Sequence, residues 1–201
     1  MEENFSTILG ILTGLGLAAA CGFRVFVPFL IASIAIRADV IHVAADFAWM
    51  GSTPALVALG VATLLEVGGY CLPGVDHFLD VVATPVAVVA GTLLTASFIT
   101  DMEPWFRWSL AAIAGGGAAA VVQTTTVAAR ATSAVLSLGF GNPIVSAAEF
   151  LGATTVSILA ALAPILALIA VVVAVALLWS LRRRRAEPMV ASRPAGWGSQ
   201  T

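Results

Sequence analysis

The chain has 201 residues, of which 60% are hydrophobic and only 10% are charged, and its formal net charge is −2. Soluble domains carry about 25% charged residues, whereas the mean hydropathy of this chain is +1.04. The composition excludes an ordinary soluble protein and indicates an all-α integral membrane protein whose first partner is the lipid bilayer. We expect no nucleic-acid partner.

The amino-terminal segment does not have the pattern of a cleavable secretory signal. It begins with two acidic residues, Glu2 and Glu3, and the apolar run that follows is longer than the roughly 7 to 15 residues of a signal sequence. We therefore expect this segment to remain in the mature protein as the first membrane segment.

Polar residues, prolines and glycines divide the chain into apolar segments near the length of about 20 residues that a bilayer crossing needs. There are six of them, residues 6–36, 54–72, 78–99, 106–138, 144–163 and 165–181. The division at Pro164 is open, because proline is tolerated inside membrane helices. The pattern predicts about six transmembrane helices, with five as the alternative.

The carboxy-terminal end carries the orientation signal. Arg182–Arg185 directly follow Trp179 at the end of the last apolar segment, and the positive-inside rule then predicts a cytoplasmic C-terminus. The arginine run could instead bind anionic lipid headgroups. We expect one transmembrane domain over residues 1–185 and a disordered cytoplasmic tail over 186–201, where proline and glycine recur.

The two halves of the chain share an organisation. Each begins with a Gly/Ala-rich segment leading to an arginine, Arg24 or Arg130, and each continues into an apolar segment with one glutamate, Glu66 or Glu149. Repeat one would cover about 6–99 and repeat two about 106–181. Three crossings per repeat would invert the second relative to the first, an arrangement that places transporter sites at the repeat interface.

The first segment of each half is longer than one crossing requires. A single helix over 6–36 would extend about 46 Å, so it must tilt, kink or break, with Gly22 and Pro28 as candidate positions. A break near Gly22 would place a helix N-terminus beside Arg24, where it would attract an anion. Alternatively, both long segments are re-entrant hairpins with tips near Arg24 and Gln123, which leaves four crossings.

Arg24, Glu66, Arg130 and Glu149 are the primary candidate site residues. A charge in hydrocarbon costs about 2.5 to 3.5 kcal/mol on insertion scales, so such residues face a protein interior or a watery cavity. Gln123 adds a polar group at a comparable depth of the second half. Two arginines and two glutamates can neutralise one another, which suits a structural network as well as a transport site.

Asp76, Asp80 and Asn142 are secondary candidates near the predicted membrane boundaries. Asp76 and Asp80 flank His77 and share a helix face if the third segment begins there, so they could hold a cation. Helix capping after the preceding Pro-Gly turn explains the aspartates more simply, and Asn142 before Pro143 has the same pattern. We predict no metal site.

Several motifs resemble the small bacterial membrane proteins of domain of unknown function 4126, over roughly residues 8–165. The motifs are Gly22–Pro28, Leu65–Val67, Leu72–Asp76 and Gly141–Ser146 together with Glu149. The resemblance implies a compact polytopic fold in the bacterial inner membrane and no established activity. The chain departs from the family pattern at Tyr70–Cys71, which replace an Asp-Lys pair, at Gln123 and Thr126, which replace His and Lys, and at Phe150, which replaces Asp.

These observations lead to two functional hypotheses. The first is a small transporter or channel for an ion or small solute, with Glu66 or Glu149 carrying a proton or cation and Arg24 and Arg130 binding an anionic group. The alternative is a non-transporting scaffold or accessory subunit whose charge pairs are structural. Hydrolase and dinucleotide motifs are absent, so we predict no enzyme and no cofactor. Gly/Ala faces look alike within one bundle and between protomers, which leaves a homo-oligomer open.

Overall fold

The computed structural model describes residues 2–70, 75–100, 102–137 and 141–186, and within these ranges it contains helices and no strand. The elements are α1 (Glu2–Cys21), α2 (Phe26–Arg37), the 3₁₀ helix η1 (Ala45–Gly51), α3 (Thr53–Gly69), α4 (Val75–Phe98), α5 (Pro104–Leu110), the π-helical segment η2 (Ala111–Gly116), α6 (Gly117–Ser137), α7 (Asn142–Leu162) and α8 (Pro164–Ala186). The tail predicted to be disordered falls on residues 187–201, outside the described part.

The helices are long and apolar enough for a membrane protein. Three described segments could each cross a bilayer, Leu79–Phe98, Pro104–Val135 and Pro143–Leu162, and the bent pair Ala45–Gly51 and Thr53–Gly69 would be a fourth. The remaining apolar helices are shorter. The predicted all-helical membrane fold is confirmed at this level.

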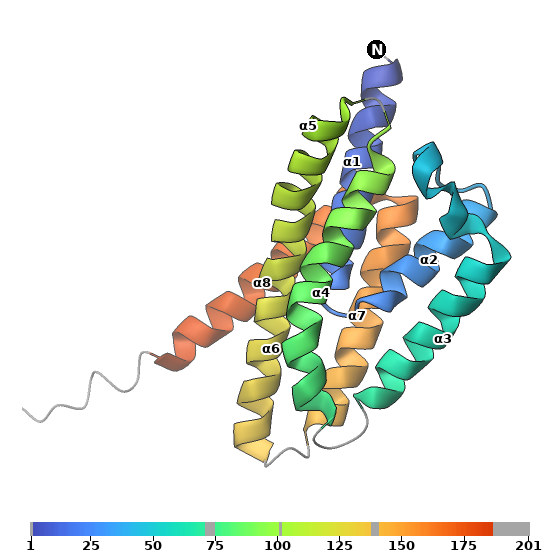
Figure 1. Cartoon of the computed structure of the whole chain (residues 1–201). Coiled ribbons are helices and arrows are strands. Elements are labelled where there is room, and N and C mark those ends of the chain that lie inside the picture. The colour runs from blue at the N-terminus through green and yellow to red at the C-terminus, as the bar shows by residue number, and fades with distance from the viewer. Residues whose placement is uncertain (1, 71–74, 101, 138–140, 187–201) are drawn as a thin grey trace, which may run out of the picture.

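The first long segment is broken, as predicted. The α1 helix ends at Cys21 and α2 begins at Phe26, so the break includes Gly22. Pro28 does not break the chain. It lies in the first turn of α2, where a missing N–H costs no helical hydrogen bond. Figure 1 shows α2 running obliquely from the lower end of α1 back toward the end of the molecule where the N-terminus lies.

The second long segment is continuous. From α5 through η2 to α6 it forms one apolar stretch, Pro104–Val135, and no hairpin turns the chain at Gln123. The only irregularity in its described helical path is the π-helical segment at Ala111–Gly116, an insertion that helices tolerate. The re-entrant alternative is therefore wrong for this segment.

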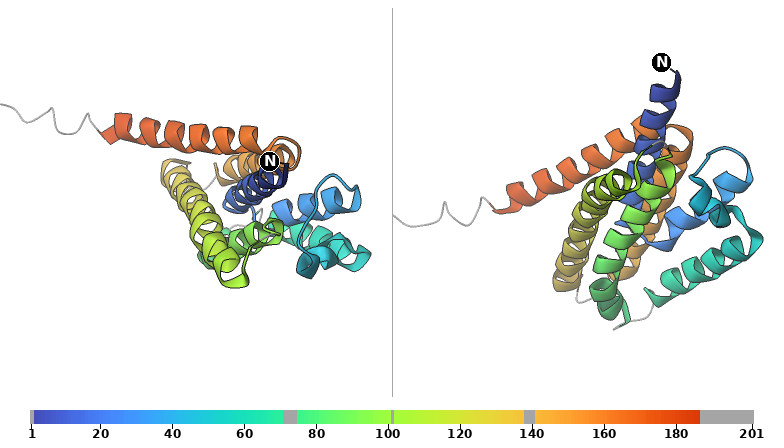
Figure 2. Two further views of the ribbon diagram at one scale, coloured as in Figure 1. Left: turned by 90° about the horizontal axis from the view of Figure 1, so that it is seen from above. Right: turned by 45° about the horizontal axis from the view of Figure 1, so that its top comes forward.

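The division at Pro164 is a real helix boundary. Ala163 has φ −150° and ψ 73°, outside the helical region, and α8 starts at Pro164. The α8 helix leaves the bundle obliquely in both views (Figures 1 and 2).

Small residues let the central helices approach closely. The α1 helix contacts α4, α6, α7 and α8 and lies near the middle of the molecule seen from above (Figure 2). A Cβ added at Gly10 would lie 2.6 Å from the Phe98 carbonyl oxygen, and one at Gly14 would lie 2.9 Å from the Thr95 Cα. Without a hydrophobic driving force in lipid, such close packing holds membrane helices together. The glycines of α1 are thus packing residues, and they place the break of the first segment against α6 and α7.

Candidate functional site

The break between α1 and α2 is held in place by α6. A Cβ on Gly22 would lie 2.6 Å from the Ala119 carbonyl oxygen and 2.8 Å from the Gln123 backbone nitrogen, both in α6. The Thr126 hydroxyl lies 3.2 Å from the Gly22 carbonyl oxygen and 2.9 Å from the Gln123 carbonyl oxygen of its own helix, so these two acceptors share its one proton. The sequence requires glycine here because α6 occupies the space of a side chain, and the contact fixes the direction in which Arg24 leaves the loop.

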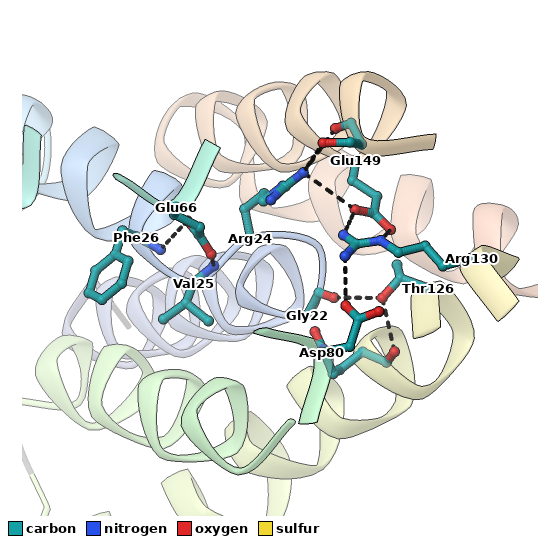
Figure 3. Close-up of polar contacts among 11 residues, drawn as sticks. Gly22, Arg24, Val25, Phe26, Glu66, Asp80, Thr126, Arg130 and Glu149 are labelled. Atoms are coloured by element: carbon teal, nitrogen blue, oxygen red, sulfur yellow. Dashed lines mark hydrogen bonds and ion pairs between the residues drawn. The ribbon is translucent and has the colours of Figure 1, made fainter. Parts of the chain in front are cut away.

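Glu66 caps the N-terminus of α2. Its Oε1 accepts from the Val25 backbone N–H at 2.7 Å, and its Oε2 accepts from the Phe26 N–H at 3.1 Å (Figure 3). These amides would otherwise be unsatisfied at a helix start, and the positive end of the helix dipole favours a carboxylate there. The anion expected at the start of this half-helix is therefore supplied by the protein itself, from α3.

Arg24 points to α7 rather than to Glu66. Its Nη2 donates to the Ser146 carbonyl oxygen at 3.2 Å and to the Ser146 hydroxyl, and it lies 3.7 Å from Glu149 Oε2. The side chain has 0% exposure, yet its Nε and Nη1 have no hydrogen-bond partner. Unpaired buried donors are uncommon and costly, so Arg24 is held in the cluster with part of its hydrogen-bonding capacity unused.

Arg130 is the most fully paired charge of the cluster. Its Nε donates to Glu149 Oε1 at 3.0 Å, its Nη2 pairs with Glu149 Oε2, and its Nη1 donates to Asp80 Oδ1 at 2.6 Å (Figure 3). A bidentate arginine–carboxylate pair is among the stronger interactions available to side chains. It ties α6 to α7 and α4, and it includes Asp80, which the sequence marked only as a secondary candidate.

Tyr70 joins the two arginines, and sequence reasoning missed it. The guanidinium carbons of Arg24 and Arg130 each lie 3.9 Å from the centroid of the Tyr70 ring, within cation–π distance. Tyr70 caps the C-terminal end of α3 and follows Glu66 by four residues, about one helical turn, so the two side chains lie on the same side of that end. That spacing was the available signal, but Tyr70 was noted only as a departure from the family pattern.

The other predicted residues are placed less centrally. Gln123 is buried at 4% exposure two turns before Arg130, and its backbone packs under Gly22 instead of joining the ion pairs. Asp76 and Asn142 lie in α4 and α7, but their side chains are outside the described part of the structure. Among the described residues, no group of His, Cys, Asp and Glu is arranged to hold a metal.

A cavity adjoins the cluster. It has a volume of about 360 Å³ and lies between α2, α3 and α4, with Glu66 and Tyr70 as its polar wall residues. The apolar wall residues are Val25, Phe26, Ala62, Leu65, Leu79, Val82, Ala83 and Val86. Small-molecule sites commonly combine apolar walls with a few convergent polar groups.

The charges of the site divide into two balanced sets. Arg24 and Arg130 are opposed by Glu149 and Asp80, and Glu66 is opposed by the N-terminus of α2. Fold and site together define an all-helical membrane protein whose buried charges meet at a broken helix. The chain belongs to the family described as Domain of unknown function (DUF4126), whose model matches residues 11–184. The resemblance carried by the sequence motifs is thereby confirmed, and no curated protein and no solved structure matches the chain.

Proposed function

We propose that this protein is a small transporter or channel for an ion or small solute, with its site at the charge cluster where the two halves of the chain meet. The observation that carries the proposal is the cavity of about 360 Å³ that has Glu66 and Tyr70 in its wall. It brings an otherwise buried carboxylate next to space that a solute can enter.

Glu66 is the group best placed to carry a proton or a cation. Each of its oxygens accepts one backbone N–H and retains a second lone pair toward other partners. Adding a proton or cation there would weaken the cap on α2. Arg24 and Arg130 favour the ionised form of the neighbouring acids, Glu149 and Asp80. Arg24 also retains unused hydrogen-bond donors for an anionic group.

Flux measurements test this proposal. Purified protein in liposomes would be assayed for protons, alkali cations and small organic anions, and we expect at least one flux above that of empty vesicles. Glu66→Gln should abolish it, whereas Glu103→Gln, which changes an exposed acid, should leave it intact. Absence of any flux above empty vesicles would contradict the proposal.

A scaffold or accessory subunit is the second candidate, and a different observation favours it. Arg130 is paired with two carboxylates, and Arg24 has no exposed side-chain surface. Dry, paired charges of this kind suit a structural role, in which they specify one arrangement of helices. Pull-downs from native membranes that return only the protein itself would count against this candidate.

For the topology, we propose that the protein spans the plasma (inner) membrane and that its C-terminus lies in the cytoplasm, because Arg182–Arg185 follow the last apolar stretch. The inverted repeat with six crossings stays a hypothesis, supported by the meeting of both Arg/Glu sets in one cluster. The return of α2 toward the N-terminal end (Figure 1) supports a re-entrant first segment instead. Reporter fusions after Arg37 and after Ala186 would separate them, since only the re-entrant form returns residue 37 to the side of the N-terminus.

A further inference from the structure

A second, larger hollow lies away from the charge cluster. It is a groove of about 930 Å³ whose walls come from α1, the η2–α6 segment and α8, and it reaches Trp179 near the end of α8. The α1 wall includes Ala19, the α6 wall includes Gly117 and Val121, and the α8 wall includes Val172. We call it the α6–α8 groove. No proposed role of the charge cluster uses it.

The walls of the α6–α8 groove offer hydrocarbon and no free hydroxyl. Thr124 and Thr125 lie in the wall, but their hydroxyls donate to the Ala120 and Val121 carbonyl oxygens of their own helix at 2.7 and 2.8 Å. Threonines bound to their own helix backbone present their methyl groups to the surroundings. A groove of this composition inside a bilayer takes an apolar chain in preference to a polar solute.

A strongly basic run follows the groove-lining part of α8 along the chain. Trp179 lines the groove, and the backbone of α8 continues to Ala186 through Arg182–Arg185. Tryptophan favours the headgroup level of a membrane, and each arginine near the surface attracts anionic lipid. Along α8 the groove-lining residues come first and the arginine run follows. A phospholipid has the same order, with its apolar acyl chain next to its charged headgroup.

We propose that the α6–α8 groove binds an acyl chain of an anionic phospholipid whose headgroup is held by Arg182–Arg185. A second copy of the chain suits the groove less well. A symmetric pair of copies packed through this face would bring two arginine runs to the same side of the membrane, where they repel. An anionic lipid neutralises the run instead.

Two glycines provide a matched pair of variants. A Cβ at Gly117, in the groove wall, and a Cβ at Gly60, on α3, would each meet nothing within 4 Å. Gly117→Leu therefore adds a bulky apolar side chain to the groove wall from a position where the Cβ is open, and it leaves the arginine run and its topology signal in place. Gly60→Leu adds the same side chain to a helix surface away from the groove.

The experiment measures phospholipid retained by the purified protein. Each variant would be extracted in mild detergent from membranes that contain zwitterionic and anionic phospholipids, and bound lipid would be quantified by mass spectrometry. We expect wild type and Gly60→Leu to retain anionic phospholipid in stoichiometric amount. Gly117→Leu should retain severalfold less. Replacing Arg182–Arg185 with Gln should reduce the preference for anionic over zwitterionic lipid by about tenfold or more.

Three results would overturn the proposal. Equal lipid retention in Gly117→Leu and Gly60→Leu would show that the groove does not hold the lipid. A wild-type protein with no preference for anionic headgroups would remove the role of the arginine run. A wild-type dimer in light scattering that Gly117→Leu converts to a monomer, with no retained lipid in either, would identify a second copy as the occupant.

Discussion

The two long Gly/Ala-rich segments of this chain each carry a buried arginine, Arg24 or Arg130, yet one segment is broken and the other is continuous. The first segment ends α1 at Cys21 and restarts at Phe26, whereas the second runs from α5 through η2 into α6. At the first break, Glu66 accepts the freed amides of Val25 and Phe26. A broken helix within a membrane persists only where protein groups satisfy its backbone.

The second segment has no such outside cap and does not break. Two of its threonines, Thr124 and Thr125, donate to carbonyl oxygens of their own helix one turn earlier. Gly115 and Gly116 pack against α4, where a Cβ at Gly115 would lie 2.6 Å from the Gly91 carbonyl oxygen and one at Gly116 would lie 2.8 Å from the Thr92 hydroxyl oxygen. A Gly/Ala-rich composition therefore permits a helix break, and a carboxylate from another helix, here Glu66, stabilises it.

The largest expected effect comes from Arg130, the buried arginine of the continuous segment. Arg130→Met leaves Glu149 and Asp80 without their main cation, and removing one partner of a buried pair typically costs about 3 to 5 kcal/mol. Unfolding in mixed detergent micelles would measure the loss. Arg107→Met is the control. The Arg107 side chain is 12% exposed, but its partner Asp46 is 76% exposed, so solvent screens this pair and it should contribute about 1 kcal/mol or less. Equal losses in both variants would contradict this account.

Glu66 tests the cap on the broken segment. Glu66→Ala leaves two amides without acceptors, and at about 1 to 3 kcal/mol for each unsatisfied group we expect a loss of about 3 kcal/mol in the free energy of unfolding. Glu66→Gln keeps one acceptor and should lose about half as much. Hydrogen exchange would locate the change in the first turn of α2. If Val25 and Phe26 stay as protected in Glu66→Ala as in wild type, the cap is not what stabilises the break.

Gly22 tests the contact between the break and α6. Gly22→Ala places a Cβ 2.6 Å from the Ala119 carbonyl oxygen, and overpacking of this kind costs about 1 to 3 kcal/mol. Gly68→Ala is the matched control, since a Cβ there meets nothing within 4 Å and alanine favours the helix. In thermal denaturation in detergent, the midpoint of Gly22→Ala should fall below that of wild type, and the midpoint of Gly68→Ala should not. A lowered midpoint in both would point to a general effect of removing glycine.

The smallest effect is expected at Thr126. Thr126→Val removes a hydroxyl shared between the Gly22 carbonyl oxygen across the helix contact and the Gln123 carbonyl oxygen of α6, and a hydrogen bond contributes about 1 kcal/mol. Thr124→Val removes only a bond within α6, from an exposed side chain, and should change the free energy of unfolding by less. The same denaturation assay compares the two. A larger loss in Thr124→Val would show that the hydroxyl of Thr126 does not pin the break.

Part of the site was predictable from the sequence, because a single charged residue in an apolar segment is conspicuous by itself. Arg24, Glu66, Arg130 and Glu149 were identified because a charge in an apolar segment must find a partner. The cost of a buried charge does not identify the partner of that charge. Asp80 ranked low because capping explained it locally, and Tyr70 carried no cost that would draw attention to it. Asp80 joined the cluster because α4 packs beside α6, and Tyr70 because the end of α3 brings its ring over the Arg130 guanidinium.

The sequence by itself determined the class of protein, the helical segments and the position of the first break, because bilayer thickness, helix rise and the cost of buried charge act on local stretches of chain. Only the tertiary structure decided that Glu66 caps α2, that Glu149 faces both arginines and that the second long segment stays continuous. Those outcomes depend on which helices are neighbours. Neighbours are chosen by close packing of Gly/Ala surfaces, which look alike along this chain.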